Sequence, residues 1–307
     1  MKLKCSFLYL LLIAILSGCT TAPYTNRSQL IITSEEQEKS MGLQLFNQVQ
    51  KESQVESNPL YTNPVQRVGN HIANAAKDKY YAWEFIVIRS QDINAFCLPG
   101  GKVIVYTGLF QFIDNDAELA CVLSHEIGHA IARHGGENIS RQYMQQLGAV
   151  ALSSAVSSSE NYELWMGAYG LGTDLGVMLP FSREQEYEAD QIGLILMAKA
   201  GYDPRAALTF WNKFKNLQNY GPLEEFFATH PMGEKRIEEI NALMPDTMQI
   251  YELIQPKYGL GQPINLKNPQ NISTSENISP QNNPQGSNLI YKKKTKSAKS
   301  LKKPTLQ

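Results

Sequence analysis

The chain is poor in cysteine and has no apolar run long enough to span a membrane. Only four of its 307 residues are cysteine, and two of these lie within the first 19 residues. The N-terminal apolar run ends at Leu16, short of the ~20 residues that a membrane helix needs. Residues 137–180 are also rich in apolar side chains, but glutamines, serines and acidic residues interrupt them. These absences exclude membrane-spanning helices and favour a globular domain with a single core.

The first residues carry the signature of a bacterial lipoprotein. A positively charged start and an apolar run precede Leu16-Ser17-Gly18-Cys19, which matches a lipobox. We therefore predict that residues 1–18 are a lipoprotein signal peptide, that Cys19 is lipidated, and that residues 19–32 are a linker. Thr20 rather than an aspartate follows the cysteine. By the usual sorting pattern, this predicts an outer-membrane lipoprotein facing the periplasm of a Gram-negative bacterium; a plain secretory signal is the alternative.

This location limits the partners and the chemistry of the remaining cysteines. Cys97 and Cys121 would lie in a compartment that permits disulfides. A bond between them is one alternative, but we expect two buried free thiols, with no role for Cys121 as a metal ligand. A periplasmic location also excludes nucleic acid as a partner.

Five consecutive residues, His125-Glu126-Ile127-Gly128-His129, form an HExxH motif. The surrounding stretch is apolar on nearly every side, starts after Asp114-Asn115-Asp116 and reaches Gly135-Gly136. We predict a buried helix that the glycine pair terminates. Residues four apart lie one turn above each other on one helix face. His125 and His129 can therefore offer two imidazole nitrogens to one zinc ion, and Glu126 beside them can take a proton from an attacking water.

The third ligand that a catalytic zinc ion needs does not follow directly after this motif. One known arrangement has a histidine six positions after the second histidine, where this chain has Gly135. His134 is one position short, and we expect it to be a helix-end histidine favoured by the helix dipole.

A later segment, Ser182–Asp190, offers carboxylates instead. Glu186 and Asp190 are four residues apart, so both share one helix face. This spacing suits one zinc ligand and one carboxylate that orients a ligating histidine. Glu184 and Glu188 lie in the same segment, and spacing alone does not choose among the four acids.

Three segments carry a family resemblance: HEIGHAIARHG, SREQEYEADQIG and THPMGEKRI. Together they resemble metallopeptidase family 48. The resemblance runs from about residue 33 to residue 243 and is strongest to the soluble lipoprotein or periplasmic branch of bacteria. It implies an α+β fold that is mainly α-helical and zincin-like (gluzincin), with a small β-sheet beside the HExxH helix. It also implies one Zn²⁺ per chain, with Glu126 as the general base. The implied zinc ligands are His125, His129 and Glu186, and Asp190 is implied to orient one of the histidines.

Three further residues are candidates for the reaction. Asn94 opens the segment NAFCLPGGKVIVYTGL. The two β-rich runs WEFIVIRS and KVIVYT lie on either side of its Pro-Gly-Gly turn, and a strand beside the HExxH helix can hold an extended substrate. Asn94 either contacts that substrate or caps its own loop. His230, in Thr229-His230-Pro231, either precedes a helix without a special role or, as the resemblance suggests, approaches the zinc and gates the site. Arg236 either stabilises the oxyanion or forms a structural ion pair.

The domain boundaries follow from composition. We place the zinc metallopeptidase domain at residues 33–245, with residues 137–180 forming two amphipathic helices over the active-site cleft. Residues 246–265 are expected to be an extended C-terminal segment. Residues 266–307 are rich in polar residues and lysine, with seven lysines between Lys292 and Lys303, and are predicted to be a disordered tail. Such a tail offers a contact to anionic lipid or cell-wall polymers.

The sequence therefore predicts a zinc-dependent endopeptidase. Its expected substrates are misfolded or unassembled envelope proteins, and its expected anchor is the outer membrane through lipidated Cys19. The alternative from another class is an outer-membrane protein assembly factor or chaperone, with a latent zinc site that His230 gates.

Overall fold

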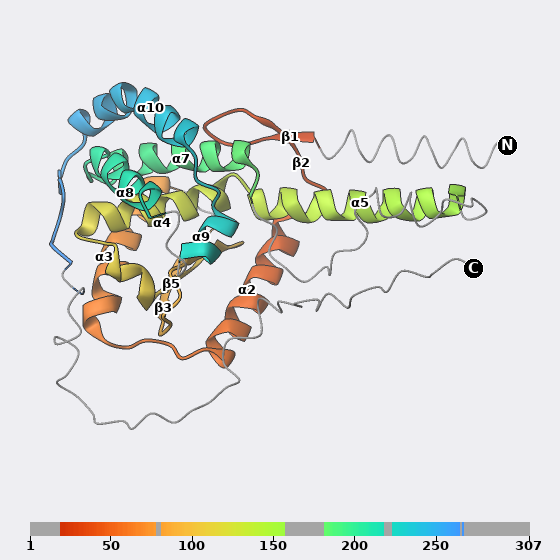
Figure 1. Ribbon diagram of the computed structural model, residues 1–307, viewed down its shortest axis with the longest axis horizontal. Helices are drawn as coiled ribbons and strands as arrows, with labels where there is room; N and C mark the ends of the chain where they lie inside the picture. Colours follow the sequence, from red (N-terminus) through yellow and green to blue (C-terminus); the bar gives the residue numbers. More distant parts are fainter. Residues whose placement is uncertain (1–18, 78–80, 157–180, 218–222, 265, 267–307) are drawn as a thin grey trace, which may run out of the picture.

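The computed structural model describes residues 19–77, 81–156, 181–217, 223–264 and 266 (Figure 1). The predicted signal peptide, residues 1–18, lies outside these ranges, as does the predicted lysine-rich tail apart from residue 266. The second half of the stretch 137–180 lies outside them as well. None of the helices within the described ranges combines the length and the apolarity that crossing a bilayer requires.

Helices make up most of the fold, and a small sheet accompanies them, as the sequence predicts. The helices are α2 (Glu35–Glu52), α3 (Pro59–Ala76), α4 (Asp116–Ile131), α5 (His134–Val156), α7 (Arg183–Lys199), α8 (Arg205–Lys215), α9 (Glu224–Thr229) and α10 (Glu234–Leu253), with a 3₁₀ turn η1 (Thr107–Gln111). The strands are β1 (Cys19–Thr21), β2 (Ser28–Leu30), β3 (Glu84–Ile88), β4 (Ala95–Leu98) and β5 (Lys102–Tyr106).

The three-stranded sheet has the order β3-β5-β4. Both β-rich runs that the sequence indicates are strands, and β3 pairs with β5 in parallel. The Pro-Gly-Gly turn joins β4 to β5, which are antiparallel. Gly100 and Gly101 both have φ of +84°, in the left-handed region that glycine enters without strain. β4 therefore lies at one edge of the sheet, and it contacts α4.

The central helix α4 is buried along its whole length, as its apolar sequence predicts. The Asn115 side chain caps it by accepting a hydrogen bond from the Glu118 amide. Its end differs from the prediction: α4 stops at Ile131, Arg133 takes a left-handed conformation with φ of 55°, and Gly135-Gly136 lie in the first turn of α5. The Glu38 carboxylate lies against both places. It pairs with Arg133 at 2.7 Å, and it approaches Gly136 so closely that a Cβ there would lie 2.2 Å from Oε1.

Two other predicted boundaries change. α10 continues to Leu253, so residues 246–253 of the segment expected to be extended are helical. The chain beyond them is held against the start of α4, where the amides of Asp116 and Ala117 donate to the carbonyls of Gln262 and Leu260. The stretch from residue 137 was expected to lie over the cleft as paired helices; in its described part it is the single helix α5, which extends away from the rest of the fold (Figure 1).

The predicted linker, residues 19–32, is also more than a linker. β1 and β2 form an antiparallel hairpin, which we call the N-terminal hairpin, beside α5 and α7 (Figure 1). Arg27 of this hairpin pairs with Glu137 of α5 and Glu188 of α7, each at 2.7 Å. The hairpin therefore belongs to the folded domain.

Candidate metal centre

Four buried side chains from three regions of the chain gather at one point. His125 and His129 come from α4, Glu186 comes from α7, and His230 follows α9. One potential ligand atom of each lies within 4.8 Å of those of the other three. None of these side chains is more than 3% exposed. The spacing of His125 and His129 on α4 brings their Nε2 atoms to 3.1 Å, as the HExxH motif predicts.

The donor set and its spacing fit a zinc ion. Zinc bonds of about 2.0–2.1 Å in a tetrahedron place neighbouring ligand atoms about 3.3 Å apart. Glu186 lies 3.2 Å from His129 Nε2 and 3.5 Å from His125 Nε2. Although Arg236 Nη1 is 2.6 Å from one Glu186 oxygen, neither oxygen accepts a hydrogen bond of good geometry. The Glu186 oxygens therefore keep lone pairs for a further ligand such as a metal ion, and two imidazoles with one carboxylate are typical zinc ligands.

Helix packing brings Glu186 to the histidines. α4 and α7 contact each other more extensively than any other pair of described elements. Each helix has a glycine at the contact: a Cβ on Gly128 would lie 2.9 Å from the Ala189 carbonyl oxygen, and a Cβ on Gly193 would lie 3.1 Å from the His125 amide nitrogen. The glycines therefore allow the approach that places the carboxylate beside both imidazoles.

His230 occupies the fourth position of the cluster. Its Nδ1 lies 3.4 Å from both His125 Nε2 and Glu186 Oε1, and its Nε2 lies 3.5 Å from Glu126 Oε1. Glu126 is buried, which raises the pKa of its carboxyl above the ordinary value. The structure thus brings the expected general base and His230 together at the corner that the three expected ligands leave open.

Asp190 and Arg236 lie against His125. Asp190 Oδ1 is 2.9 Å from His125 Nδ1, the position from which it can orient the ring. Arg236 bonds Asp190 through Nε at 2.5 Å and Nη2 at 2.9 Å, with its guanidinium 4.1 Å from the centre of the Trp211 ring. Arg236 also pairs with Glu186, so its contacts are those of a structural ion pair, the alternative to an oxyanion role that the sequence left open.

The charges of these groups control their ionisation. Burial opposes the ionised form of Glu186, but chiefly because of the Arg236 charge the pKa of Glu186 lies well below its ordinary value. Burial and Arg236 oppose protonation of His125, but Asp190 and Glu186 outweigh them and raise the pKa of His125 to about 9. Burial lowers the pKa of His129 well below its ordinary value. A metal ligand must be unprotonated, so the Glu186 carboxylate suits a zinc ion as it stands, whereas zinc would have to displace a proton from His125.

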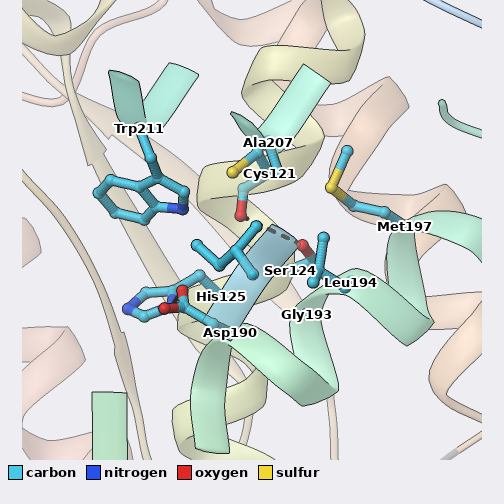
Figure 2. A pocket seen from close by; sticks show the side chains of 10 residues that line it. Cys121, Ser124, His125, Asp190, Gly193, Leu194, Met197, Ala207 and Trp211 are labelled. Atoms are coloured by element: carbon cyan, nitrogen blue, oxygen red, sulfur yellow. Dashed lines mark hydrogen bonds and ion pairs between the residues drawn. The ribbon is translucent and has the colours of Figure 1, made fainter. Parts of the chain in front are cut away.

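Figure 2 shows a small pocket between α4, α7, α8 and α10, and His125 and Asp190 belong to its lining. Its lining is mainly apolar and includes Cys121, Met197 and Trp211. Cys121 is a buried free thiol here and is not one of the clustered potential ligands. Cys97, on β4, is free as well, so the two cysteines do not form a bond.

Asn94 lies directly before β4 and is buried. Its side-chain oxygen accepts a hydrogen bond from the Ala95 amide, at 2.8 Å, and its carbonyl accepts one from the Tyr106 amide. The side chain therefore caps its own loop, which is the alternative that the sequence left open. The edge strand that follows it remains the element suited to hold an extended peptide.

Sequence reasoning named His134 and Glu188 but did not predict that His134 contacts the cluster and joins it to Glu188. His134 Nδ1 lies 2.8 Å from His129 Nδ1, and His134 Nε2 lies 2.8 Å from Glu188 Oε2. Residues five apart do not share a helix face, so these contacts could not be predicted from the spacing of the two histidines. They arise because α4 ends at Ile131 and the chain turns at Arg133, which returns His134 to the second histidine of the motif.

These features define a zincin-like metallopeptidase domain: one helix carries two histidines and a glutamate, a second helix supplies a carboxylate, and an edge strand lies alongside. The model of peptidase family M48 matches residues 59–244. The chain belongs to this family, whose members are zinc metallopeptidases.

Relatives come from mitochondria and from bacteria. The chain is 40% identical to mitochondrial metalloendopeptidase OMA1 of Arabidopsis thaliana over 57% of its own length and 34% of that protein. It is 35% identical to the OMA1 protein of Schizosaccharomyces pombe over 73% of its length and 66% of that protein. It is 30% identical to the beta-barrel assembly-enhancing protease of Escherichia coli over 70% of its length and 46% of that protein. It thus spans between about a third and two thirds of these relatives.

Proposed function

We propose that this chain is a zinc-dependent endopeptidase that degrades misfolded or unassembled envelope proteins. The observation that carries the proposal is the buried Glu126 carboxylate beside the corner that His125, His129 and Glu186 leave open. A purely structural zinc site would have no use for such a carboxylate. The family has protein substrates, and the Escherichia coli relative is named for the assembly of β-barrel proteins.

The residues divide the work of peptide hydrolysis. A zinc ion held by His125, His129 and Glu186 would supply a Lewis acid that polarises the scissile carbonyl and lowers the pKa of water. Glu126 takes a proton from the attacking water and donates it to the leaving amine, and burial raises its pKa toward the range suited to both steps. β4 pairs with the extended substrate backbone. Asp190, held by Arg236, keeps His125 oriented.

The proposed location is the periplasmic face of the outer membrane, through lipid on Cys19. The lipobox supports it, and so does the bacterial relative, whose name refers to β-barrel assembly. The lysine-rich tail would add a contact to anionic lipid or cell-wall polymers. The mitochondrial relatives share the peptidase domain in a different compartment.

A second function is an outer-membrane protein assembly factor whose zinc site is latent. The observation in its favour is the position of His230, which fills the fourth corner and lies 3.5 Å from Glu126. An imidazole there competes with water and substrate. On this account proteolysis requires that His230 moves away.

Cleavage of unfolded casein by the full chain, with zinc counted in the same preparation, tests both functions. We expect wild type and Glu126→Gln each to contain about one zinc, and only Glu126→Gln to lose turnover, by a factor of about 10²–10⁴ for the missing general base. His230→Ala is expected to raise turnover. His71→Ala is the matched control, because His71 stacks on Tyr258 outside the cluster.

Each outcome separates the functions. Zinc at one per chain with no cleavage by wild type or His230→Ala would support an assembly factor in which the zinc is mainly structural, and cleavage by His230→Ala alone would support the latent site. Retained cleavage in Glu126→Gln would remove Glu126 as the base, and unaltered or lower turnover in His230→Ala would remove the gate. A wild-type chain without zinc would overturn both functions.

A further inference from the structure

The two expected histidine ligands are oriented by different means. His125 contacts a carboxylate directly, through Nδ1 and Asp190. His129 contacts a second imidazole: its Nδ1 lies 2.8 Å from His134 Nδ1, and His134 in turn reaches Glu188 at 2.8 Å. Both carboxylates are held by an arginine, Asp190 by Arg236 and Glu188 by Arg27.

The contacts from His129 through His134 to Glu188 form a path of hydrogen bonds, and hydrogen bonding fixes the order of protons along it. A metal bound at His129 Nε2 leaves the proton on Nδ1, which must then donate to His134 Nδ1. His134 can accept there only if its own proton is on Nε2, and from Nε2 it donates to Glu188 Oε2. Glu188 ends the path because an ionised carboxylate only accepts. Every group on the path therefore has a partner in one arrangement, and that arrangement is the one that leaves His129 Nε2 free for a metal.

Glu188 owes its position to the N-terminal hairpin. Arg27 Nε donates to Glu188 Oε2 at 2.7 Å, and the Thr25 hydroxyl donates to Glu188 Oε1. The same guanidinium donates twice to Glu137, at 2.7 and 3.0 Å. Together these bonds hold both oxygens of the Glu188 carboxylate.

The hairpin presents Arg27 in a defined conformation. Its turn is closed by the Ala22 amide, which donates to the Arg27 carbonyl at 2.9 Å, and Ala22 is only 1% exposed. The Arg27 side chain is partly buried, with 23% of its surface exposed, and that of Glu188 is 3% exposed. An ion pair of this kind is screened less by solvent than a surface pair.

We propose that His134 and Glu188 are positioning residues for His129, and that Arg27 couples the docking of the N-terminal hairpin to the affinity of the metal centre. This inference rests on the proposed function in that it takes zinc as the ligand. It extends that function because it makes the N-terminal hairpin part of the site, although the hairpin lies outside α4 and α7, the helices that carry the HExxH motif and Glu186. Loss of a hydrogen-bonded partner of a zinc ligand typically weakens metal binding about 10–100-fold.

The test is the zinc dissociation constant of the full chain, measured by competition with a chelator at constant neutral pH. His134→Phe keeps a ring in place but removes both hydrogen bonds, and we expect binding about 10–100-fold weaker. Arg27→Gln is expected to weaken binding in the same direction by a smaller factor. Arg89→Gln is the matched control, since Arg89 makes a comparable forked pair with buried Glu56 elsewhere in the fold. It should leave the dissociation constant unchanged.

Coupling separates a positioning path from general destabilisation. In the His134→Phe background, Arg27→Gln should weaken zinc binding by a smaller factor than it does in the wild type, because the path is already broken. The visible spectrum of the Co²⁺-substituted protein should change in His134→Phe and not in Arg89→Gln. Equal factors for Arg27→Gln in both backgrounds, or an unchanged Co²⁺ spectrum in His134→Phe, would overturn the proposal.

A second variant covers the case in which His134→Phe does not fold. His134→Asn keeps an acceptor for His129 but has no donor that reaches Glu188, so Arg27→Gln should again lose its effect in that background. A wild-type chain that binds no zinc would refute the proposed function itself. A wild-type chain that binds zinc with the same affinity as Arg27→Gln would refute only this inference.

Discussion

Four of the five histidines in the chain lie in the metal centre or directly against it, and each has a charged or imidazole partner. Burial of so many titratable groups is costly unless they are paired. Among single residues, Arg236 compensates for the burial of two carboxylates. It is 1% exposed and pairs with both Asp190 and Glu186. Its charge allows the two carboxylates to stay ionised inside the domain.

We predict that Arg236→Met lowers the unfolding free energy of the metal-free protein by about 3–5 kcal/mol, because two buried carboxylates lose their cation. Denaturant unfolding monitored by circular dichroism measures this. Lys215→Met is the control: its partner Glu234 has 80% of its side chain exposed, and such a pair contributes about 0–1 kcal/mol. Equal losses in the two variants would show that Arg236 does not have this role.

At the scale of elements, the contact between α4 and α7 determines whether the residues of the site meet. Glu186 is held by its helix, and that helix can approach only because Gly128 and Gly193 leave room. A side chain at either glycine would contact backbone, which cannot rotate away. The contact therefore has little tolerance for added volume.

We predict that Gly193→Val destabilises the protein by about 1–3 kcal/mol and weakens zinc binding, because the two helices must move apart. Thermal unfolding and chelator competition measure the two effects. Gly233→Ala is the matched control, since a Cβ there would have no atom within 4 Å. A variant that is destabilised but binds zinc as tightly as wild type would mean that Glu186 does not depend on this contact.

At the scale of the whole molecule, ion pairs join segments that are distant in the chain. Arg27 ties the N-terminal hairpin to α5 and α7, and Arg89 ties β3 to the residues before α3. Burial opposes ionisation of Glu188, but bonds from His134, Thr25 and Arg27 outweigh it and lower its pKa. The pKa of Glu137 is lowered as well, chiefly by Arg27 acting against burial.

The lowered pKa values of Glu137 and Glu188 determine how the stability of the folded state changes with pH. A carboxyl group with a lowered pKa in the folded state stabilises that state above its ordinary pKa of 4.5. The stabilisation is lost as the pH falls through the folded-state pKa, because the unfolded chain then binds more protons. We predict that wild type is more stable than Arg27→Gln at neutral pH and that the difference narrows as the pH falls below 4.5. Thermal unfolding of the metal-free proteins across that range measures it.

Lys199→Gln provides the comparison, because Lys199 lies over the Tyr24 ring rather than beside a carboxylate. Its effect on stability should not change between neutral and acidic pH. A constant difference between wild type and Arg27→Gln down to pH values well below 4.5 would show that the hairpin is not held by these carboxylates.

The sequence predicted the structural features that depend on residues close together in the chain. The 3.6-residue period places His125 and His129 on one face of α4, Asn115 caps that helix, and Glu186 and Asp190 share one face of α7. It could not place the end of α4, because the interaction that stabilises Arg133 comes from Glu38 on a distant helix. It also predicted an extended segment from residue 246, where α10 continues for eight more residues, because the composition there did not indicate the packing that sustains the helix.

Local sequence patterns were thus enough to predict the class of protein, the expected metal ligands and the two helices that carry them. The surroundings of those residues depend on how distant segments pack. This packing put His230 at the fourth corner, gave Arg236 two carboxylate partners, and joined His129 through His134 and Glu188 to Arg27. The reason is physical: helical periodicity and caps act over a few residues, whereas the partners of a buried charge are set by which segments pack together.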